Sequence, residues 1–331
     1  MRAKAPLAFV SLLLLCGCSK LAVFEPENVD GRLSYDDRLE APIAKTALDG
    51  ASLENGRIVS RKKTTIDRLD DGFYLLSIDG GYAIAADRKG ALMLYGLEGK
   101  PKRFDFAEAI VSAATDGKII VAVSKTNACR VIDAQNSKTL FFSREKSALA
   151  VSDKLAKPLI GKQQAIIPTL DGKLLIVDRA AMKIAKEIAL GDEEFFGNVV
   201  FLAEYDNHVI AAVDGRATSI AANGARRSRD IDARTLAALP SGLYIFARDG
   251  AVERVSAKLE TIAANRLPYA RFIAAAEKDD AIWAVEQSGY VVKFTDDLKE
   301  AKIYELPDTI RASVYIGDQG AWHYDRLVRW R

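Results

Sequence analysis

The chain has 331 residues, of which 49% are hydrophobic and 28% charged, and its formal net charge is +2 at pH 7. This composition provides enough apolar material for a folded core and excludes wholesale disorder. Residues 1–17 contain Arg2 and Lys4 and no acidic residue, so the chain without this segment is formally neutral. A neutral chain with no basic stripe lacks the main driving force for nucleic-acid binding, and we expect none.

The first 18 residues have the pattern of a targeting segment. Two basic residues precede an apolar run over 7–15, and Leu15-Cys16-Gly17-Cys18 closes it. This resembles the bacterial lipoprotein signal, which implies cleavage after residue 17 and acylation of Cys18. The apolar run is too short to cross a bilayer, which needs roughly 20 residues, so a processed signal is expected rather than a permanent helix. The alternative is an ordinary secretory cleavage.

The residues after Cys18 indicate where the anchor is sorted. Ser19 and Lys20 follow it, and the second mature position is not Asp. By resemblance to the sorting pattern of enteric bacteria, this favours the periplasmic side of the outer membrane, with the inner membrane as the alternative. More than one acyl chain on Cys18 would anchor the protein stably. Residues 18–50 mix Pro, Gly and charges without a period, and we expect them to form a tether.

From residue 51 to 331, tight polar turns separate apolar runs at intervals of about 35 to 46 residues, a period typical of β-propeller blades. Asp-Gly and related pairs provide the positive φ of a two-residue hairpin turn, and the flanking β-branched residues favour strands. The turns fall at Asp79-Gly80-Gly81, Asp116-Gly117-Lys118, Ile160-Gly161-Lys162, Asp206-Asn207-His208, Ser241-Gly242, Asp279-Asp280 and Asp318-Gln319-Gly320.

Each unit between turns holds four strand-length runs. The inner runs are continuously apolar and the outer ones alternate with charges, which matches the burial gradient across a propeller blade. The clearest examples are 109–114, 119–124, 129–133 and 139–142 in one unit, and 272–276, 281–285, 290–294 and 301–304 in another. An alternating β/α fold, with a helix over 180–190, is the competitor. It is disfavoured because the intervals are too short for two strands and a crossover helix.

Counting turns predicts an all-β propeller of seven four-stranded blades in a single domain, 51–331. Eight blades is the alternative if residues 30–60 hold more strands. The last unit stops one strand short, whereas the run Arg57–Arg61 has no unit of its own. Because a ring should leave no strand edge unpaired, we expect Ile58 and Val59 to complete the last blade. In the irregular unit 147–191, Asp171-Gly172 is expected to join its second and third strands.

The run Asp171-Gly172-Lys173-Leu174-Leu175-Ile176-Val177-Asp178 resembles the blade consensus of quinoprotein-type propellers, a family that includes the lipoprotein of the outer-membrane barrel-assembly machinery. The overall plan also resembles the exported WD40-like propeller that accompanies periplasmic nitrate reductase in some ε-proteobacteria. Quinone-dependent members carry regularly placed tryptophans. Here Trp283, Trp322 and Trp330 all fall late in the chain, so no quinone cofactor is expected.

The sequence contains no pattern of a catalytic or metal site. Cys129 lies in an apolar strand and is expected to be a buried structural thiol. His208 and His323 fall in units on nearly opposite sides of the ring, which argues against a shared metal site. The alternative function is a hydrolase or lactonase acting in the channel. It would need inward-pointing Asp, Glu, Asn or His side chains at one channel mouth.

These observations favour a membrane-anchored, non-catalytic platform that binds other envelope proteins, in envelope assembly or beside a periplasmic enzyme system. Loops on a rigid frame commonly carry recognition, and aromatic side chains commonly anchor it. Phe195, Phe196 and Tyr269 are the candidate anchors, and each has packing between blades as its alternative role.

Overall fold

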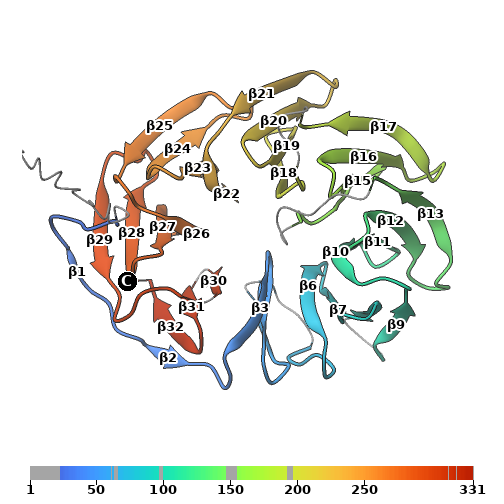
Figure 1. Cartoon of the computed structure of the whole chain (residues 1–331), viewed down its shortest axis with the longest axis horizontal. Helices are drawn as coiled ribbons and strands as arrows, with labels where there is room; N and C mark the ends of the chain where they lie inside the picture. Colours follow the sequence, from blue (N-terminus) through green and yellow to red (C-terminus); the bar gives the residue numbers. More distant parts are fainter. Residues whose placement is uncertain are drawn as a thin grey trace, which may run out of the picture.

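The strands of this chain form eight sheets around a common axis, as the computed structural model shows in Figure 1. The structure describes residues 23–60, 62, 66–96, 100–146, 155–191, 197–311, 313–317 and 319–330. Those ranges contain strands and turns and no helix, hence none that is long and apolar enough to cross a membrane. The predicted all-β propeller is confirmed.

Five sheets are meanders of four consecutive antiparallel strands. They are β6 (Tyr74–Asp79), β7 (Tyr82–Ala86), β8 (Ala91–Tyr95) and β9 (Lys102–Asp105); β10 (Ile110–Thr115), β11 (Ile119–Ser124), β12 (Ala128–Asp133) and β13 (Thr139–Arg144); β14 (Leu159–Ile160), β15 (Gln164–Pro168), β16 (Lys173–Asp178) and β17 (Lys183–Ala189); β18 (Phe201–Tyr205), β19 (His208–Val213), β20 (Arg216–Ala221) and β21 (Arg226–Asp230); and β22 (Ala233–Leu239), β23 (Gly242–Ala247), β24 (Ala251–Val255) and β25 (Thr261–Arg266).

The N-terminal residues take part in the other three sheets. The first contains β26 (Phe272–Lys278), β27 (Ala281–Glu286), β28 (Tyr290–Thr295) and β29 (Ala301–Glu305), with β1 (Gly31–Arg32) parallel to β29. The second contains β30 (Val314–Gly317), β31 (Gly320–His323) and β32 (Arg326–Arg329), completed by β2 (Asp37–Arg38). The third contains β3 (Ile43–Ala47), β4 (Gly50–Leu53) and β5 (Ile58–Ser60), and an isolated bridge from Arg57 to Arg68 lies beside it.

The blade count is therefore eight, which confirms the alternative and shows that the main prediction of seven is wrong. The additional blade is formed by β3, β4 and β5, within the stretch that the alternative named. Residues 31–50 lie on the ring, where a tether was expected. Charges in this stretch hide its strands, because β1 and β2 are short outer strands that pair through their backbones and bury little.

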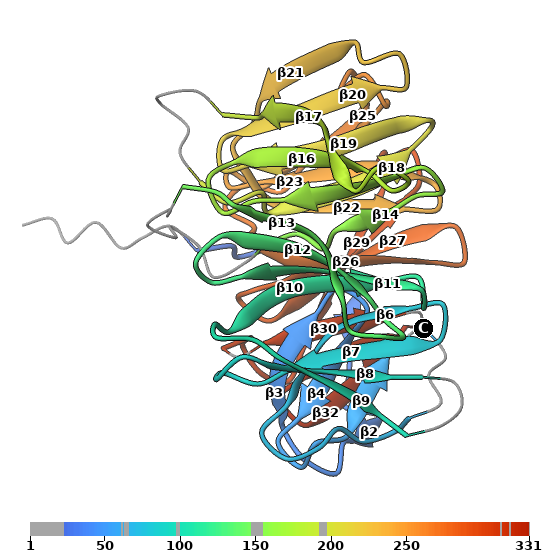
Figure 2. The ribbon, with the colours of Figure 1, turned by 90° about the vertical axis from the view of Figure 1, so that its right-hand side faces the viewer.

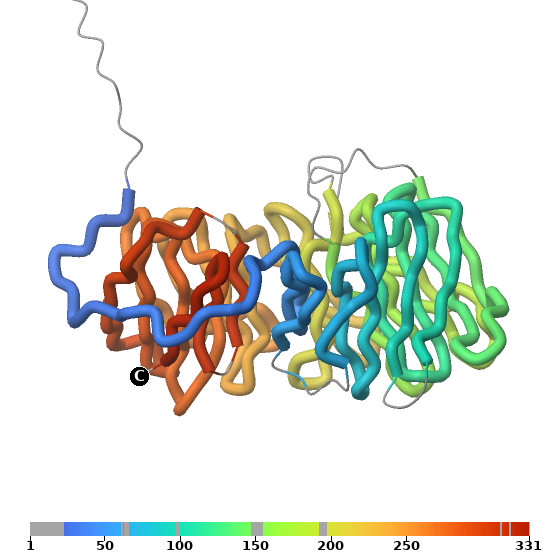
Figure 3. The backbone as a smooth tube through the Cα atoms, turned by 90° about the horizontal axis from the view of Figure 1, so that it is seen from below, coloured from blue at the N-terminus to red at the C-terminus, as the bar shows by residue number. Residues whose placement is uncertain are grey.

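An N-terminal strand does close the last blade, but it is not the predicted one. Val59 pairs with Ala51 inside its own sheet. The last blade is closed by Asp37 and Arg38, antiparallel to β32 and flanked by the bond from the Leu39 amide to the Asp325 carbonyl, 2.6 Å. Figure 3 shows this blue segment crossing the red strands of the last blades. Two charged residues suffice because backbone groups alone make the pairing.

Burial follows the predicted gradient from the axis outward. The first strands of the sheets lie nearest the axis in Figure 1, and Figure 2 shows the ring from its side. All six residues of β11 are buried, whereas six of the seven residues of the outermost strand β17 are exposed. The stretch 180–190 thus holds a strand, and Asp171-Gly172 joins β15 to β16, both as predicted.

Apolar side chains of neighbouring sheets interleave to form the core. One cluster joins Ile84 and Leu92 of one sheet with Ile110 and Ile120 of the next, and all four are fully buried. Each such side chain contributes about 1.5–3 kcal/mol to stability by leaving water. The sheets are held rigidly enough to fix the turns at their ends.

Candidate functional site

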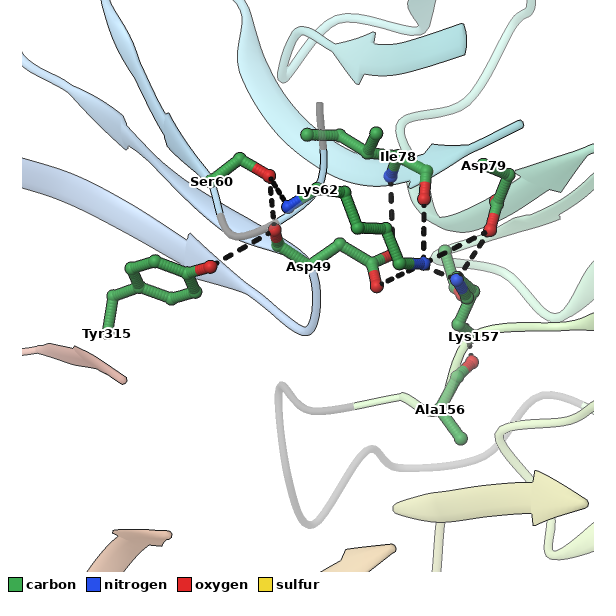
Figure 4. Close-up of polar contacts among 9 residues, drawn as sticks. Asp49, Ser60, Lys62, Ile78, Asp79, Ala156, Lys157 and Tyr315 are labelled. Carbon is green, nitrogen blue, oxygen red and sulfur yellow. Dashed lines mark hydrogen bonds and ion pairs between the residues drawn. The ribbon is translucent and has the colours of Figure 1, made fainter. Parts of the chain in front are cut away.

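A cluster of charged side chains lies at the inner edge of three sheets (Figure 4). Asp49 lies in the turn between β3 and β4, and Asp79 flanks the Gly80-Gly81 turn between β6 and β7. Lys157 comes just before β14, and because Pro158 follows it, its backbone is biased toward an extended conformation. Its Nζ lies 2.8 Å from Asp49 Oδ2 and 2.7 Å from Asp79 Oδ1.

Further polar contacts surround Asp49. Lys62 Nζ lies 2.7 Å from Asp49 Oδ1 and donates to the carbonyl of Ile78 at 2.9 Å. The amide of Ile78 donates to Asp49 Oδ2 at 3.2 Å, and the hydroxyls of Ser60 and Tyr315 donate to the Asp49 carbonyl. The Asp49 side chain is 5% exposed, so this turn is fixed on every side.

The pKa values in the cluster show that it is charged. Burial alone would raise the pKa of Asp49, but the ammonium groups of Lys157 and Lys62 outweigh burial and lower it. Burial alone would lower the pKa of Lys157, but the carboxylates of Asp49 and Asp79 outweigh burial and raise it. Both groups are therefore ionised at neutral pH.

The carboxylates of Asp49 and Asp79 thus lie close together, as a channel enzyme would need, but both are paired with the ammonium group of Lys157. Lys157 takes the position between Asp49 and Asp79 that a bound cation would take. Within the described residues, no group of three His, Cys, Asp or Glu side chains is placed to hold a metal ion. The geometry is that of a tie between three blades.

A second candidate region is a continuous strip of connections and turns. Backbone bonds link its parts: Leu267 donates to Gly250, Gln287 to Arg271, and Ile310 to Gln287, each at 3.0 Å. The ion pair between Arg326 Nη1 and Asp308 Oδ2, 3.2 Å, extends it to the last blade. We call residues 248–250, 267–271, 287–289, 306–311 and 323–326 the loop strip.

The sequence-predicted residues are only partly described by the structure. Tyr269 lies in the loop strip, is 58% exposed and has a positive φ of 67°. An exposed aromatic ring in a left-handed backbone conformation is available to a partner, and here it does not pack between blades. Phe195, Phe196 and Cys18 lie outside the described residues.

Arginine side chains gather in this part of the strip, where the exposed Arg271 is two residues from Tyr269. Arg234 donates from Nη2 to Gln287 Oε1 at 2.6 Å, and burial and the nearby charges of Arg271 and Arg248 lower its pKa. Arg248 pairs with Asp214 and Asp232, both at 3.1 Å. This part of the strip combines arginines, of which Arg248 is paired with aspartates, with an exposed tyrosine.

A hollow of about 480 Å³ opens at the other end of the strip, beside the last blade. Three segments far apart in the sequence line it: Tyr35 from the N-terminal region, the connection after β29, and the turn between β31 and β32. The lining residues are Tyr35, Asp308, Thr309, Arg311, His323, Tyr324 and Arg326.

No family model matches the chain. The plasminogen-binding protein PgbB of two Helicobacter pylori strains is 22% and 21% identical to it, over 90% of this chain and 64% of the relative in each case. The match therefore spans less than two thirds of the length of those relatives.

Solved structures share the fold. BamB from Moraxella catarrhalis superposes with a TM-score of 0.67 at 14% identity, over 89% of this chain and 98% of BamB. The C-terminal WD40 domain of Sif2 superposes with a TM-score of 0.65 at 13% identity, over 92% and 99% of the two chains. The resemblance to the barrel-assembly lipoprotein and to WD40-like propellers is confirmed for the fold.

The cysteine and the two histidines considered as catalytic or metal-binding candidates have ordinary structural environments. Cys129 is fully buried, as predicted, and burial raises its pKa to about 12, so the thiol is not a nucleophile at neutral pH. His208 donates within its own turn, from Nδ1 to the Asp206 carbonyl at 2.8 Å. His323 lines the hollow.

Sequence reasoning missed the hollow and the charged cluster. Tyr35 lies in the stretch expected to be a tether, and Lys157 lies in the least regular unit. One sequence feature could have pointed to the cluster. Lys157 precedes Pro158, which biases the Lys157 backbone toward an extended conformation and places a charged side chain next to an apolar strand.

Proposed function

We propose that this protein is a lipid-anchored envelope protein that binds another envelope protein through the loop strip and does not turn over small molecules. The observation that carries the proposal is the strip itself. Backbone bonds and one ion pair join its five segments into one surface, and it displays the exposed Tyr269 two residues from the exposed Arg271. Exposed aromatic and arginine side chains on a rigid frame are typical of binding anchors.

The relatives support a binding role. PgbB is named for binding plasminogen, which is a protein ligand, and its similarity covers 90% of this chain. The match covers 64% of PgbB and leaves 36% without a counterpart, and plasminogen binding could depend on that part. Plasminogen is therefore a candidate ligand to test and not an assigned one. BamB adds an envelope propeller of the same fold.

The best candidate site for a channel enzyme is the pair of carboxylates of Asp49 and Asp79, and Lys157 already occupies the position between them. A hydrolase of that kind needs carboxylates free to hold a cation or move a proton, whereas Asp49 and Asp79 are engaged by ammonium groups. The charged cluster holds blades together and leaves recognition to the loop strip.

The proposed anchor enters the ring at this same surface. The ring of Phe24 packs edge-on against Tyr290 with centroids 5.4 Å apart, and Tyr290 directly follows the 287–289 turn of the strip. Covalent geometry allows at most about 20 Å between Cys18 and Phe24. Acylation of Cys18 would therefore hold the loop strip close to the membrane, where partners in the membrane are within reach.

Site-specific photocrosslinking in intact cells tests the binding face. A photoreactive amino acid at position 269 is expected to give adducts with another protein. The control is position 262, because Ile262 lies on the outer strand β25 and has the same 58% exposure as Tyr269. Equal adducts from both positions, or none from 269, would refute the loop strip as the binding face.

The anchor has a separate test. Cys18→Ser is expected to abolish incorporation of an acyl label and to move the protein out of the membrane fraction. Persistent labelling of this variant would contradict acylation at Cys18.

A further inference from the structure

The side chains that line the hollow at the end of the loop strip carry one positive charge in excess, and Asp325 behind Arg326 is paired with Arg38 at 2.8 Å. Its lining contains the guanidinium groups of Arg311 and Arg326 against the single carboxylate of Asp308. Asp308 Oδ2 accepts from the Tyr35 hydroxyl at 3.0 Å and from Arg326 Nη1 at 3.2 Å. The Asp308 carboxylate therefore already has a hydroxyl donor and a cationic partner, and it does not form a site for a further cation.

Arg326 is fixed in place, whereas Arg311 is available. The guanidinium of Arg326 stacks over the Tyr35 ring at 4.8 Å and also approaches Asp325 Oδ1 at 3.6 Å. Arg311 is exposed, and among the described residues its side chain is bonded only to the Thr309 hydroxyl, Nε to Oγ1, 3.2 Å. A guanidinium that no carboxylate of the described residues engages presents a two-pronged donor that matches a carboxylate.

The remaining walls are aromatic or uncharged. Tyr324 is 52% exposed and its φ of 56° places it at a left-handed turn position. Burial lowers the pKa of His323; Asp308 and Asp325 act in the opposite sense, and Arg326 acts with burial. His323 is neutral at pH 7, so it adds a polar ring and no charge.

We propose that this hollow binds a carboxylate carried by a peptide segment of the protein partner, with an apolar or aromatic neighbour of that carboxylate packed on Tyr324. The inference rests on the proposed function, since it names what the loop strip recognises. Charge complementarity selects the carboxylate, and Arg311 is its main donor.

The shape of the hollow favours a peptide over a small free acid. Sites for small molecules are concave and bury most of their ligand. This hollow opens widely to solvent and is continuous with the loop strip through Ile310, whose amide donates to Gln287. An extended chain can place one side chain in the hollow and run along the strip.

The chain contains a convenient local probe, because His323 and His208 are its only two histidines. Imidazole NMR signals of the isolated protein can be followed during titration with a five-residue capped peptide that has glutamate between two phenylalanines. A twin peptide with glutamine in place of glutamate tests the charge, and propionate alone tests a free acid.

The glutamate peptide is expected to shift the His323 signals saturably and leave those of His208 unchanged. The glutamine twin should bind about tenfold more weakly, and Arg311→Gln should remove that difference. Arg311 is exposed and makes one side-chain hydrogen bond within the described part of the chain, so the variant is expected to keep the fold, which its circular dichroism spectrum verifies.

Equal binding of the two peptides, or unmoved His323 signals, would overturn the proposal. Propionate binding as tightly as the glutamate peptide would overturn its peptide part in favour of a small acid. These outcomes are independent of the crosslinking at position 269. The peptide titration uses the isolated protein without its partner, and the crosslinking experiment does not depend on a ligand in the hollow.

Discussion

Lys157 brings one positive charge to a place where two carboxylates from other blades would otherwise repel each other. Its side chain is 14% exposed and that of Asp49 is 5% exposed, so water screens this pair weakly. Breaking a buried ion pair from one side leaves an uncompensated charge, which costs more than forming the pair returns. The contact is therefore sensitive to single substitutions.

Lys157→Met is expected to lower the free energy of unfolding by about 2–4 kcal/mol, because the Asp49 carboxylate stays buried with Lys62 as its remaining partner. Chemical denaturation measures the loss. Lys299→Met is the matched control, since Lys299 Nζ lies at the same 2.8 Å from Asp297 Oδ2 but its side chain is 82% exposed. We expect no measurable change there, and an equal loss in both variants would contradict the role given to burial.

The difference between the parent and Lys157→Met should depend on pH in both directions. The pKa of Asp49 is lowered, so its contribution is present above the unfolded value near 3.9 and lost as pH falls through the folded pKa. The pKa of Lys157 is raised, so its contribution is present below about 10.4 and lost as pH rises through the folded pKa. Denaturation curves should show a constant difference between pH 5 and 9 that narrows below pH 4 and above pH 10.5. A difference independent of pH would rule out the charges as its cause.

Single residues were predicted best where local chemistry decides their place. Asp171-Gly172 must be a turn and Cys129 must be buried, because each follows from its immediate neighbours. Lys157 and Tyr35 bind partners that are distant in sequence, and Arg311 lines a hollow formed by distant segments. No periodicity in one sequence shows which blades will face each other.

At the scale of elements, β2 shows how little apolar surface a closing strand requires. It has two residues, both exposed, and it completes a blade by backbone bonding to β32. Strand prediction depends on hydrophobic pattern, so it found the buried strands of the central blades and missed β1 and β2. The same reasoning assigned β5 to the last blade because it appeared to lack a sheet. Its true partner, β4, begins at residue 50, where the tether was expected to end, and β3 lies within the expected tether.

Leu39→Pro is expected to open the end of β2. Proline removes the amide that donates to the Asp325 carbonyl, whereas the control Leu39→Ala keeps it. Hydrogen exchange of the amides in β32 should become about tenfold faster in the proline variant than in the alanine variant. Equal exchange in the two would mean that β2 does not protect β32.

At the scale of the whole molecule, a pairing between strands from the two ends of the chain closes the ring. We expect this closure to contribute more to thermal stability than the small number of paired residues suggests. A chain that ends at Trp322 lacks β32 and leaves β2 without its partner. It also lacks Trp330, whose ring stacks on Trp283 of the neighbouring blade at 5.0 Å.

This shortened chain is expected to melt at least about 10 °C lower than the parent in calorimetry, with a broader transition, because both sides of the open ring expose unpaired edges. The control is a chain that begins at Val23, which keeps every described strand and should melt like the parent. Similar melting of the shortened chain and the parent would show that closure contributes little.

The pairing of Asp37 with Leu327 also sets an order in time. The two residues are about 290 positions apart, and a ribosome adding 5–20 residues per second needs roughly 15–60 s to travel from one to the other. Throughout that interval β2 has no partner to pair with, although the blades between can already assemble. Any factor that shields a nascent or exported chain would have to protect this N-terminal segment longest, and release it only when the final strand arrives.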